Sequence, residues 1–308
     1  MNESVYPIGT PGKPWGEEEK ALWLSQQIIK RSYADEVLVK LEALKDRFDV
    51  QQYGVLSMDA TRYPLYILRS KMWQDGKPIA LVTGGVHGYE TSGVQGAIRF
   101  LETRAKEFAA DFNLLAAPCV SPWSYETINR WNPLAIDPNR SFKADSSCEE
   151  AQSLMAYAGQ LAAMISVHID LHETTDSDNS EFRPALAARD GITQDRLSIP
   201  DGFYLVGDSQ RPAPEFQQAI ITAVERVTHI APPDEDGRLI GDKLEQRGVV
   251  NYHARASGLC MGMTEAPYVT TTEVYPDSPL VDAENCIQAQ VAAVASGLEF
   301  VRSVLAAD

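Results

Sequence analysis

Hydrophobic and polar positions change their spacing repeatedly along the chain, and each change predicts a new element. Segments in which apolar residues recur every three or four positions predict helices, and short apolar runs that end at Gly, Pro or polar residues predict buried strands. The predicted helices span 16–48, 91–108, 147–161, 215–229 and 279–305. The predicted strands span 50–58, 63–69, 79–83, 112–120, 164–171, 203–206 and 259–264. This alternation is typical of an α/β protein with a single mixed β-sheet and helices on both faces.

Nothing in the sequence divides the chain into separate units. It contains no internal repeat and no linker rich in Gly or Ser, so we predict a single catalytic domain over residues 1–308. With 308 residues, of which 44% are hydrophobic and 23% charged, the chain is long enough to bury a large core.

Charge and cysteine usage limit the partners. The chain has 27 basic and 43 acidic side chains, and its formal charge of −16 repels nucleic acid backbones and anionic membranes. The sequence contains no run of about 18 apolar residues, so it predicts no membrane-spanning helix. The N-terminal segment lacks the basic and apolar regions of a secretory signal. The four cysteines are scattered without a Cys-x-x-Cys pair, so we predict a reduced, cytoplasmic protein. From its negative charge we predict that it has no nucleic acid or membrane partner.

The candidate chemistry is concentrated in two short segments. The first, GVHGYE, places His87 and Glu90 three residues apart on a glycine-flanked turn after the predicted strand 79–83. The second, DLHE, places His172 at the end of the predicted strand 164–171. Two histidines and one glutamate are a ligand set for a catalytic zinc ion that keeps one position open for water. These residues therefore predict a metal-dependent hydrolase with one zinc ion per chain.

Neighbouring residues leave some alternatives open. His168 lies on the same predicted strand as His172 and is a rival ligand, but His172 ends the strand and is preferred. Asp170 and Glu173 flank His172, and either carboxylate could orient a liganding histidine. Glu265 closes the last predicted strand, so we expect its carboxylate at the same edge of the sheet.

Four segments together resemble the zinc carboxypeptidase family. These segments are GGVHGYE, NRWNPLAIDPNRSF, DLHE and TEAP, and their order and spacing agree with the family over residues 79–265. The resemblance implies a zinc carboxypeptidase-like fold and a metallocarboxypeptidase that removes the C-terminal residue of a peptide.

The resemblance also assigns roles to individual residues. It implies zinc ligation by the two histidines and the glutamate named above, and it makes Glu265 the general base. It places Arg130 beside the scissile carbonyl, where it would stabilise developing negative charge. It implies that Asn139 and Arg140 bind the terminal carboxylate of the substrate.

The match to the family is incomplete in two places. The family usually has Leu and Asn where this chain has Pro138 and Ser141, which alters the loop but keeps the Asn-Arg pair. The family's mobile tyrosine has no clear counterpart at the usual distance before Glu265, and Tyr252 is the nearest candidate.

Two other functions remain open. N-acyl amino acid deacylases of the aspartoacylase and succinylglutamate desuccinylase type share the zinc site and the Asn-Arg pair. The segment DLHET also resembles a sequence segment of those enzymes. Both classes hydrolyse an amide next to a free carboxylate. Those deacylases carry a β-rich domain after the catalytic Glu, whereas mostly one predicted helix follows Glu265 here, which favours the carboxypeptidase. A catalytically silent, peptide-binding relative is disfavoured because every ligand, Arg130 and Glu265 are retained.

Overall fold

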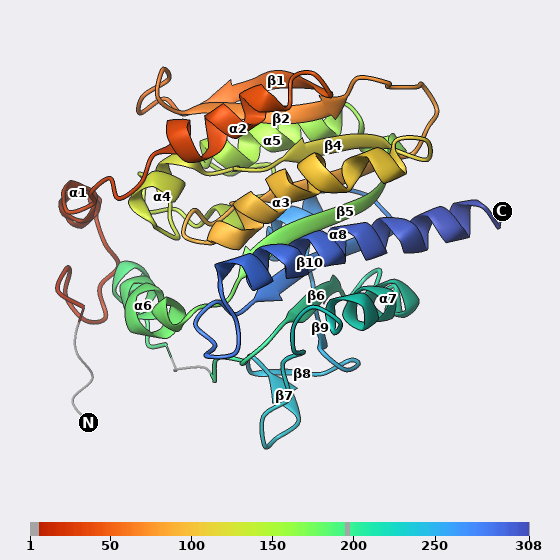
Figure 1. Ribbon diagram of the computed structural model, residues 1–308. Coiled ribbons are helices and arrows are strands. Elements are labelled where there is room, and N and C mark those ends of the chain that lie inside the picture. Colours follow the sequence, from red (N-terminus) through yellow and green to blue (C-terminus); the bar gives the residue numbers. More distant parts are fainter. Residues whose placement is uncertain (1–5, 195–197, 308) are drawn as a thin grey trace.

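The computed structural model describes residues 6–194 and 198–307. Within these residues, eight strands form one mixed sheet in the order β1-β2-β4-β3-β5-β10-β6-β9 (Figure 1). The strands of this sheet are β1 Phe48–Val55, β2 Pro64–Ser70, β3 Ile79–Gly84, β4 Asn113–Ala117, β5 Ile165–Glu173, β6 Tyr204–Asp208, β9 Val249–Tyr252 and β10 Tyr268–Val274. Two short strands, β7 Arg238–Leu239 and β8 Asp242–Lys243, pair with each other.

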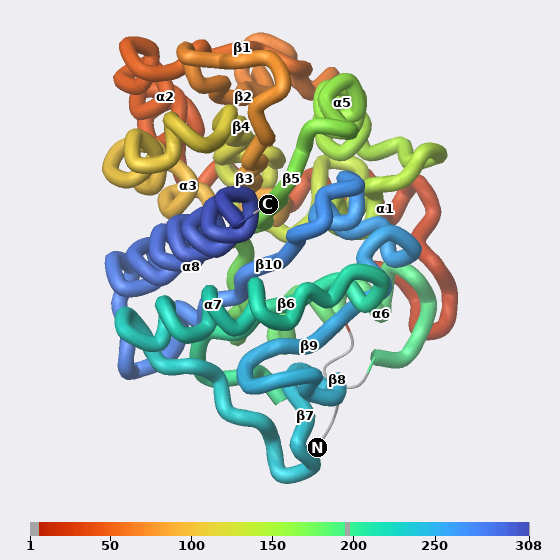
Figure 2. The backbone as a smooth tube through the Cα atoms, turned by 90° about the vertical axis from the view of Figure 1, so that its right-hand side faces the viewer, coloured from red at the N-terminus to blue at the C-terminus, as the bar shows by residue number. Residues whose placement is uncertain are grey.

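Helices cover both faces of the sheet, which confirms the predicted fold class. The α-helices are α1 Glu17–Ser25, α2 Val39–Ala43, α3 Thr91–Thr103, α4 Pro122–Thr127, α5 Glu149–Gly159, α6 Arg183–Asp190, α7 Pro214–Val224 and α8 Ala283–Leu305. Shorter helical turns include η1 Ala34–Leu38, η2 Ala105–Phe108, η3 Pro138–Arg140, η4 Ala162–Met164, η5 Asp178–Phe182 and η6 Cys260–Met263. Helices α2, α3, α7 and α8 lie on one side of the sheet and α5 on the other (Figure 2). No helix of the described residues has both the length and the apolar character needed to cross a membrane.

Two large apolar clusters hold the layers together. One lies between the sheet and the α3, α7 and α8 layer and includes Phe100, Leu171 and Val294. The other lies between the sheet and α5 and includes Leu81 and Leu154. Burial of each such side chain contributes about 1.5–3 kcal/mol, so packing on both faces fixes the positions of the central strands.

The four inner strands, β4, β3, β5 and β10, run parallel to one another. Their pairing places Thr83 beside Asp170, and His172 beside Glu273. The loops after β3 and β5 therefore both leave the sheet at the edge where the parallel strands end. Open α/β sheets collect functional side chains at this edge.

The predicted helix 16–48 is interrupted after α1. The backbone N–H groups of Lys30 and Arg31 donate to the carbonyl oxygen of Glu126, at 2.8 and 3.2 Å. Ile28, whose spacing predicts a buried position, is exposed. Contact with a distant part of the chain therefore replaces helical hydrogen bonds here, which local spacing does not reveal.

The predicted strand 259–264 is wrong. Most of this segment forms the turn η6, in which the backbone N–H of Cys260 donates to Asn139 Oδ1 at 2.8 Å. Gly262 packs against the backbone of Ala254, where an added Cβ atom would lie 2.6 Å from the carbonyl carbon. The close approach of these backbone segments bends the chain away from the sheet.

The strand that the sequence should have yielded in this region is β10, with the sequence YVTTTEV. Threonine is β-branched and forms strands readily. Because its hydroxyl group makes it polar, a threonine-rich strand does not stand out as an apolar run. Two of the three buried threonine hydroxyls have side-chain partners, because Thr270 donates to Gln217 Oε1 at 2.8 Å and Thr272 donates to Gln290 Oε1, whereas the Thr271 hydroxyl has no partner among the described residues. The correction moves the end of the strand from Glu265 to Val274.

Candidate metal centre and active site

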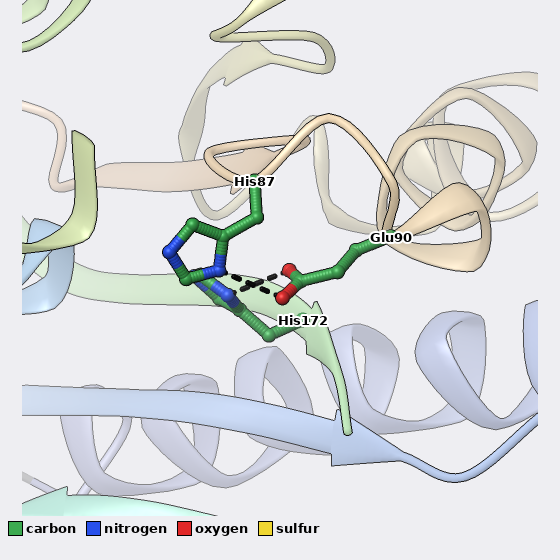
Figure 3. A group of neighbouring side chains, drawn as sticks. All are labelled: His87, Glu90 and His172. Atoms are coloured by element: carbon green, nitrogen blue, oxygen red, sulfur yellow. Dashed lines mark hydrogen bonds and ion pairs between the residues drawn. The ribbon is translucent and has the colours of Figure 1, made fainter. Parts of the chain in front are cut away.

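A turn and a strand end bring the three candidate ligands together (Figure 3). The turn after β3 begins at Gly85, whose φ of +62° lies in the left-handed region that favours glycine. His87 lies on this turn, Glu90 immediately precedes α3, and His172 lies near the end of β5. The Nδ1 atoms of His87 and His172 lie 2.7 Å from Glu90 Oε1 and Oε2, respectively.

A second carboxylate orients each histidine. His87 Nε2 lies 2.9 Å from Asp137 Oδ1, and His172 Nε2 lies 2.7 Å from Asp170 Oδ2. A carboxylate that accepts a hydrogen bond from Nε2–H leaves the Nδ1 lone pair directed toward Glu90. Metal-ligating histidines are usually held by an outer carboxylate or carbonyl in this way.

The chemistry of this group fits a divalent cation. All three side chains are buried, and one ligand atom of each lies within 4.8 Å of the others. Glu90 Oε2 has no hydrogen-bond partner among the described residues, although it lies 2.7 Å from His172 Nδ1. A buried carboxylate oxygen without a hydrogen-bond donor is costly unless a cation compensates its charge. Imidazole nitrogen and carboxylate oxygen are ligand types that zinc accepts.

The carboxylates of this group remain ionised at neutral pH. Burial opposes ionisation of Glu90, but the adjacent imidazoles of His172 and His87 outweigh it and lower the pKa of Glu90 to about 2. Burial also opposes ionisation of Asp137, but Arg130 and His87 hold its pKa well below the usual value. Negative charge is therefore available both to ligate a cation and to orient His87.

Arg130 is held beside the cluster by three acceptor groups. Its Nε donates to Asp137 Oδ2 at 3.0 Å, and its Nη1 donates to the Tyr89 hydroxyl and to Asp178 Oδ1, both at 3.2 Å. The Tyr89 hydroxyl in turn donates to Asp178 Oδ1 at 3.0 Å. Since Asp137 also orients His87, the guanidinium of Arg130 is fixed relative to the candidate ligands.

Asn139 and Arg140 follow Asp137 on the same loop. Asn139 Oδ1 accepts the hydrogen bond from Cys260 N, and its Nδ2 lies 3.5 Å from His172 Nε2. Arg140 is exposed, and its Nη1 donates to the Asn139 carbonyl oxygen at 2.7 Å. The structure thus brings the predicted carboxylate-binding pair to the candidate metal centre.

A single cavity of about 1370 Å³ joins these side chains. It is larger than the roughly 300–1,000 Å³ of most small-molecule pockets. The predicted site residues that line it are His87, Glu90, Arg130, Asn139 and Arg140. The cavity therefore has room for the end of a peptide.

Glu265 lies away from this cavity, so its predicted role as general base is corrected. It precedes β10, and the first residue of that strand, Tyr268, pairs with Val167, far from the end of β5 that carries His172. The Glu265 side chain is 66% exposed and forms an ion pair with Arg255. Its position follows from the wrong strand prediction described above.

Glu273 occupies the place that was expected for Glu265. It pairs with His172 across the neighbouring strands, lines the cavity and accepts a hydrogen bond from Thr174 Oγ1 at 2.9 Å. Burial raises the pKa of Glu273 to about 8, against the opposing effect of His172 and with a contribution from Glu90. The signal that could have identified it is the β-branched run TTT directly before it.

Comparison with known proteins agrees with this arrangement. The sequence matches no protein-family model and no curated protein. Among solved structures, a "putative metallopeptidase" from Shewanella amazonensis is 22% identical, with a TM-score of 0.64 over 89% of this chain and 98% of that chain. The metallo-carboxypeptidase from Burkholderia cenocepacia is 14% identical, with a TM-score of 0.57 over 95% and 70%. Carboxypeptidase A from Helicoverpa armigera is 14% identical, with a TM-score of 0.58 over 96% and 75%. This chain has a zinc carboxypeptidase-like fold.

Two further residues take definite places in this carboxypeptidase-like fold. His168, the rival ligand, lies outside the cluster, and its Nε2 lies 3.0 Å from Thr83 Oγ1. Burial lowers the pKa of His168 to about 4, so its imidazole is neutral. Tyr252 lines the cavity and lies 21 residues before Glu273.

Proposed function

We propose that this chain is a zinc-dependent metallocarboxypeptidase that hydrolyses the C-terminal bond of a peptide. The observation that carries the proposal is the convergence of His87 Nδ1, His172 Nδ1 and the Glu90 carboxylate beside a large cavity. The partly buried carboxylate of Glu273 on the neighbouring strand adds a group for proton transfer. The similarity of the fold to metallo-carboxypeptidases supports the same conclusion.

His87, Glu90 and His172 are the residues that would hold one zinc ion. When bound, zinc would polarise the scissile carbonyl group and lower the pKa of a water molecule to about 7. Asp137 and Asp170 hold the two imidazole rings with Nδ1 directed inward. The fourth position of a three-ligand zinc site stays open for catalysis.

Glu273 would act as the general base in place of Glu265. Its carboxylate would accept a proton from the attacking water and pass it to the amine that leaves. The hydrogen bond from Thr174 Oγ1 fixes Oε2 and favours the ionised form. Burial gives Glu273 a higher proton affinity than an ordinary carboxylate, which suits a group that both accepts and returns a proton.

Three polar side chains would bind the substrate. Arg130, fixed by Asp137 and Asp178, would place positive charge where the oxygen of the scissile carbonyl becomes negative. The guanidinium of Arg140 matches a carboxylate in shape and charge, and the Asn139 amide adds a neutral donor. Together they would select a substrate whose scissile bond lies next to a free carboxylate.

Purified protein tests this proposal with paired substrates. We expect about one zinc ion per chain, cleavage of peptides that end in a free carboxylate, no cleavage of the same peptides with an amidated terminus, and loss of activity with a chelator. Cleavage of N-acetylaspartate or N-succinylglutamate, with none of the peptides, would replace the proposal by an N-acyl amino acid deacylase. Zinc binding without hydrolysis of either class would favour the silent, peptide-binding relative.

A further inference from the structure

We propose that Arg31 is a positioning residue for the metal centre, because it holds the turn that carries His87 and Glu90. This inference rests on the proposed function in one respect, since it takes this turn to be a metal-binding turn. Arg31 lies on the interrupted segment between α1 and α2, far from the turn in sequence. Neither the predicted helix 16–48 nor the family resemblance gives Arg31 such a role.

One guanidinium contacts the turn, the first residue of α3 directly after it, and α4. Its Nη2 donates to the carbonyl oxygen of Gly88 at 2.6 Å, and its Nη1 donates to Thr91 Oγ1 at 2.7 Å. Its Nε donates to the carbonyl oxygen of Tyr125 at 2.6 Å, and the guanidinium carbon lies 3.5 Å from the centre of the Tyr125 ring. Gly88 lies between the two ligands on this turn, so Arg31 acts directly on the backbone that sets their separation.

The opposite side of the turn packs against the backbone of α4. A Cβ atom added to Gly88 would lie 2.0 Å from the carbonyl carbon of Ser124, so nothing larger than glycine fits there. Arg31 bridges the carbonyl oxygens of Gly88 and Tyr125 across this contact. It therefore fastens the turn to α4 at the point where their backbones touch.

The segment that presents Arg31 is itself anchored to the same helix. The backbone N–H groups of Lys30 and Arg31 donate to the Glu126 carbonyl oxygen, and the Tyr33 N–H donates to Glu126 Oε1 at 2.9 Å. The buried Glu126 carboxylate also accepts a hydrogen bond from Arg62 Nε at 2.7 Å. These contacts fix the backbone on both sides of Arg31 and account for the break in the predicted helix.

Removal of the Arg31 side chain would leave the buried Gly88 carbonyl without this donor. The turn would then relax, and the distance between His87 Nδ1 and Glu90 Oε1 would change. Zinc sites require ligand distances within about 0.2 Å of their ideal values. The expected consequence is weaker zinc binding, and not only a less stable protein.

The test compares Arg31→Ala and Arg31→Lys with the matched control Arg62→Ala. Arg62 also donates to a residue of α4, but it does not contact the metal-binding turn. A competing chromophoric chelator measures the zinc dissociation constant of each purified variant, and thermal unfolding of the zinc-free proteins measures stability. We expect zinc binding about 10–100-fold weaker for Arg31→Ala, an intermediate loss for Arg31→Lys, and a change below about threefold for Arg62→Ala.

Two results would overturn the role of Arg31. One is wild-type zinc affinity in Arg31→Ala, and the other is an equal loss of affinity in both alanine variants at equal thermal stability. If the wild-type protein binds zinc but cleaves no peptide, the proposed function fails, and the zinc affinities still decide the role of Arg31. A wild-type protein without zinc affinity would refute both proposals.

Discussion

Glu265 precedes β10 and Glu273 lies near the end of that strand, and their surroundings give them different chemistry. Glu273 is enclosed by the cavity wall and lies beside His172. Glu265 is exposed and paired with Arg255. A general base must lie within reach of the reacting water and have a raised proton affinity. Of these two acids, Glu273 is the one that lines the cavity, and burial raises its pKa to about 8.

Replacement of each acid by glutamine separates their roles. For Glu273→Gln we expect zinc content to be retained and kcat to fall by about 10²–10⁴, because a general base is removed without loss of a metal ligand. Glu265→Gln is the matched control and should have near wild-type kcat. Steady-state kinetics of both variants measure kcat, and metal analysis measures their zinc content. The reverse pattern would return the base role to Glu265.

The zinc-free protein should also show the raised pKa of Glu273 in its stability. The folded-state pKa of about 8 lies above the value of about 4.3 in an unfolded chain. The folded state therefore binds this proton more tightly, and the stabilisation is present at low pH and lost as the pH rises from about 4 to about 8.

Because glutamine does not ionise, zinc-free Glu273→Gln should gain stability relative to zinc-free wild type over this range. The gain should reach on the order of a few kcal/mol by about pH 8, since one pKa unit corresponds to about 1.4 kcal/mol. Urea unfolding of the two proteins at acidic and at mildly alkaline pH measures the difference. A difference that does not change with pH would contradict the raised pKa of Glu273.

The elements that the sequence predicted correctly are those whose own residues determine their structure. Segment 79–83 is a short apolar run, and segment 164–171 places Ile, Val, Ile and Leu at alternate positions; these segments become β3 and β5. Their ends therefore place the side chains at 87, 90 and 172 together, as predicted, although zinc binding itself stays a prediction.

The elements that the sequence did not predict depend on distant contacts. The break in helix 16–48 requires Glu126, which is remote in sequence. In strand β10, the hydroxyls of Thr270 and Thr272 depend on Gln217 and Gln290, which lie on two different helices. Asp137 was recognised only as part of a motif, because its contact with His87 exists only in the folded chain.

The link between α8 and the central strands gives a prediction for these elements. Gln290 Nε2 donates to the carbonyl oxygen of His172 at 2.8 Å, and Gln290 Oε1 accepts from Thr272. Gln290→Leu would leave these buried groups unpaired and should lower the free energy of unfolding by about 1–3 kcal/mol. Gln288→Leu on the same helix is the control, since Gln288 donates a hydrogen bond to Glu284 at the surface. Denaturant unfolding measures both, and equal effects would contradict the bridging role of Gln290.

The charge of the whole molecule affects how it would bind a negatively charged substrate. A chain with a formal charge of −16 repels a substrate carboxylate at long range, so short-range contacts must bind it. Arg140 lines the cavity and carries the proposed role. Hydrogen bonds to charged groups are worth about 1.5–3 kcal/mol, which corresponds to about 10–150-fold in kcat/KM.

Arg140→Met should therefore lower kcat/KM for peptides with a free C-terminus by a factor in this range, mainly through KM. Arg247→Met is a suitable control, because Arg247 forms a surface ion pair with Glu225 and does not line the cavity. An unchanged KM in Arg140→Met would mean that another group binds the terminal carboxylate.

The most direct test of the central claim is a crystal structure of the zinc-loaded protein with anomalous scattering recorded on both sides of the zinc absorption edge. We predict one strong anomalous peak, about 2.0–2.2 Å from His87 Nδ1, His172 Nδ1 and a carboxylate oxygen of Glu90. The absence of a peak among these three side chains, or zinc bound only elsewhere on the molecule, would contradict the account.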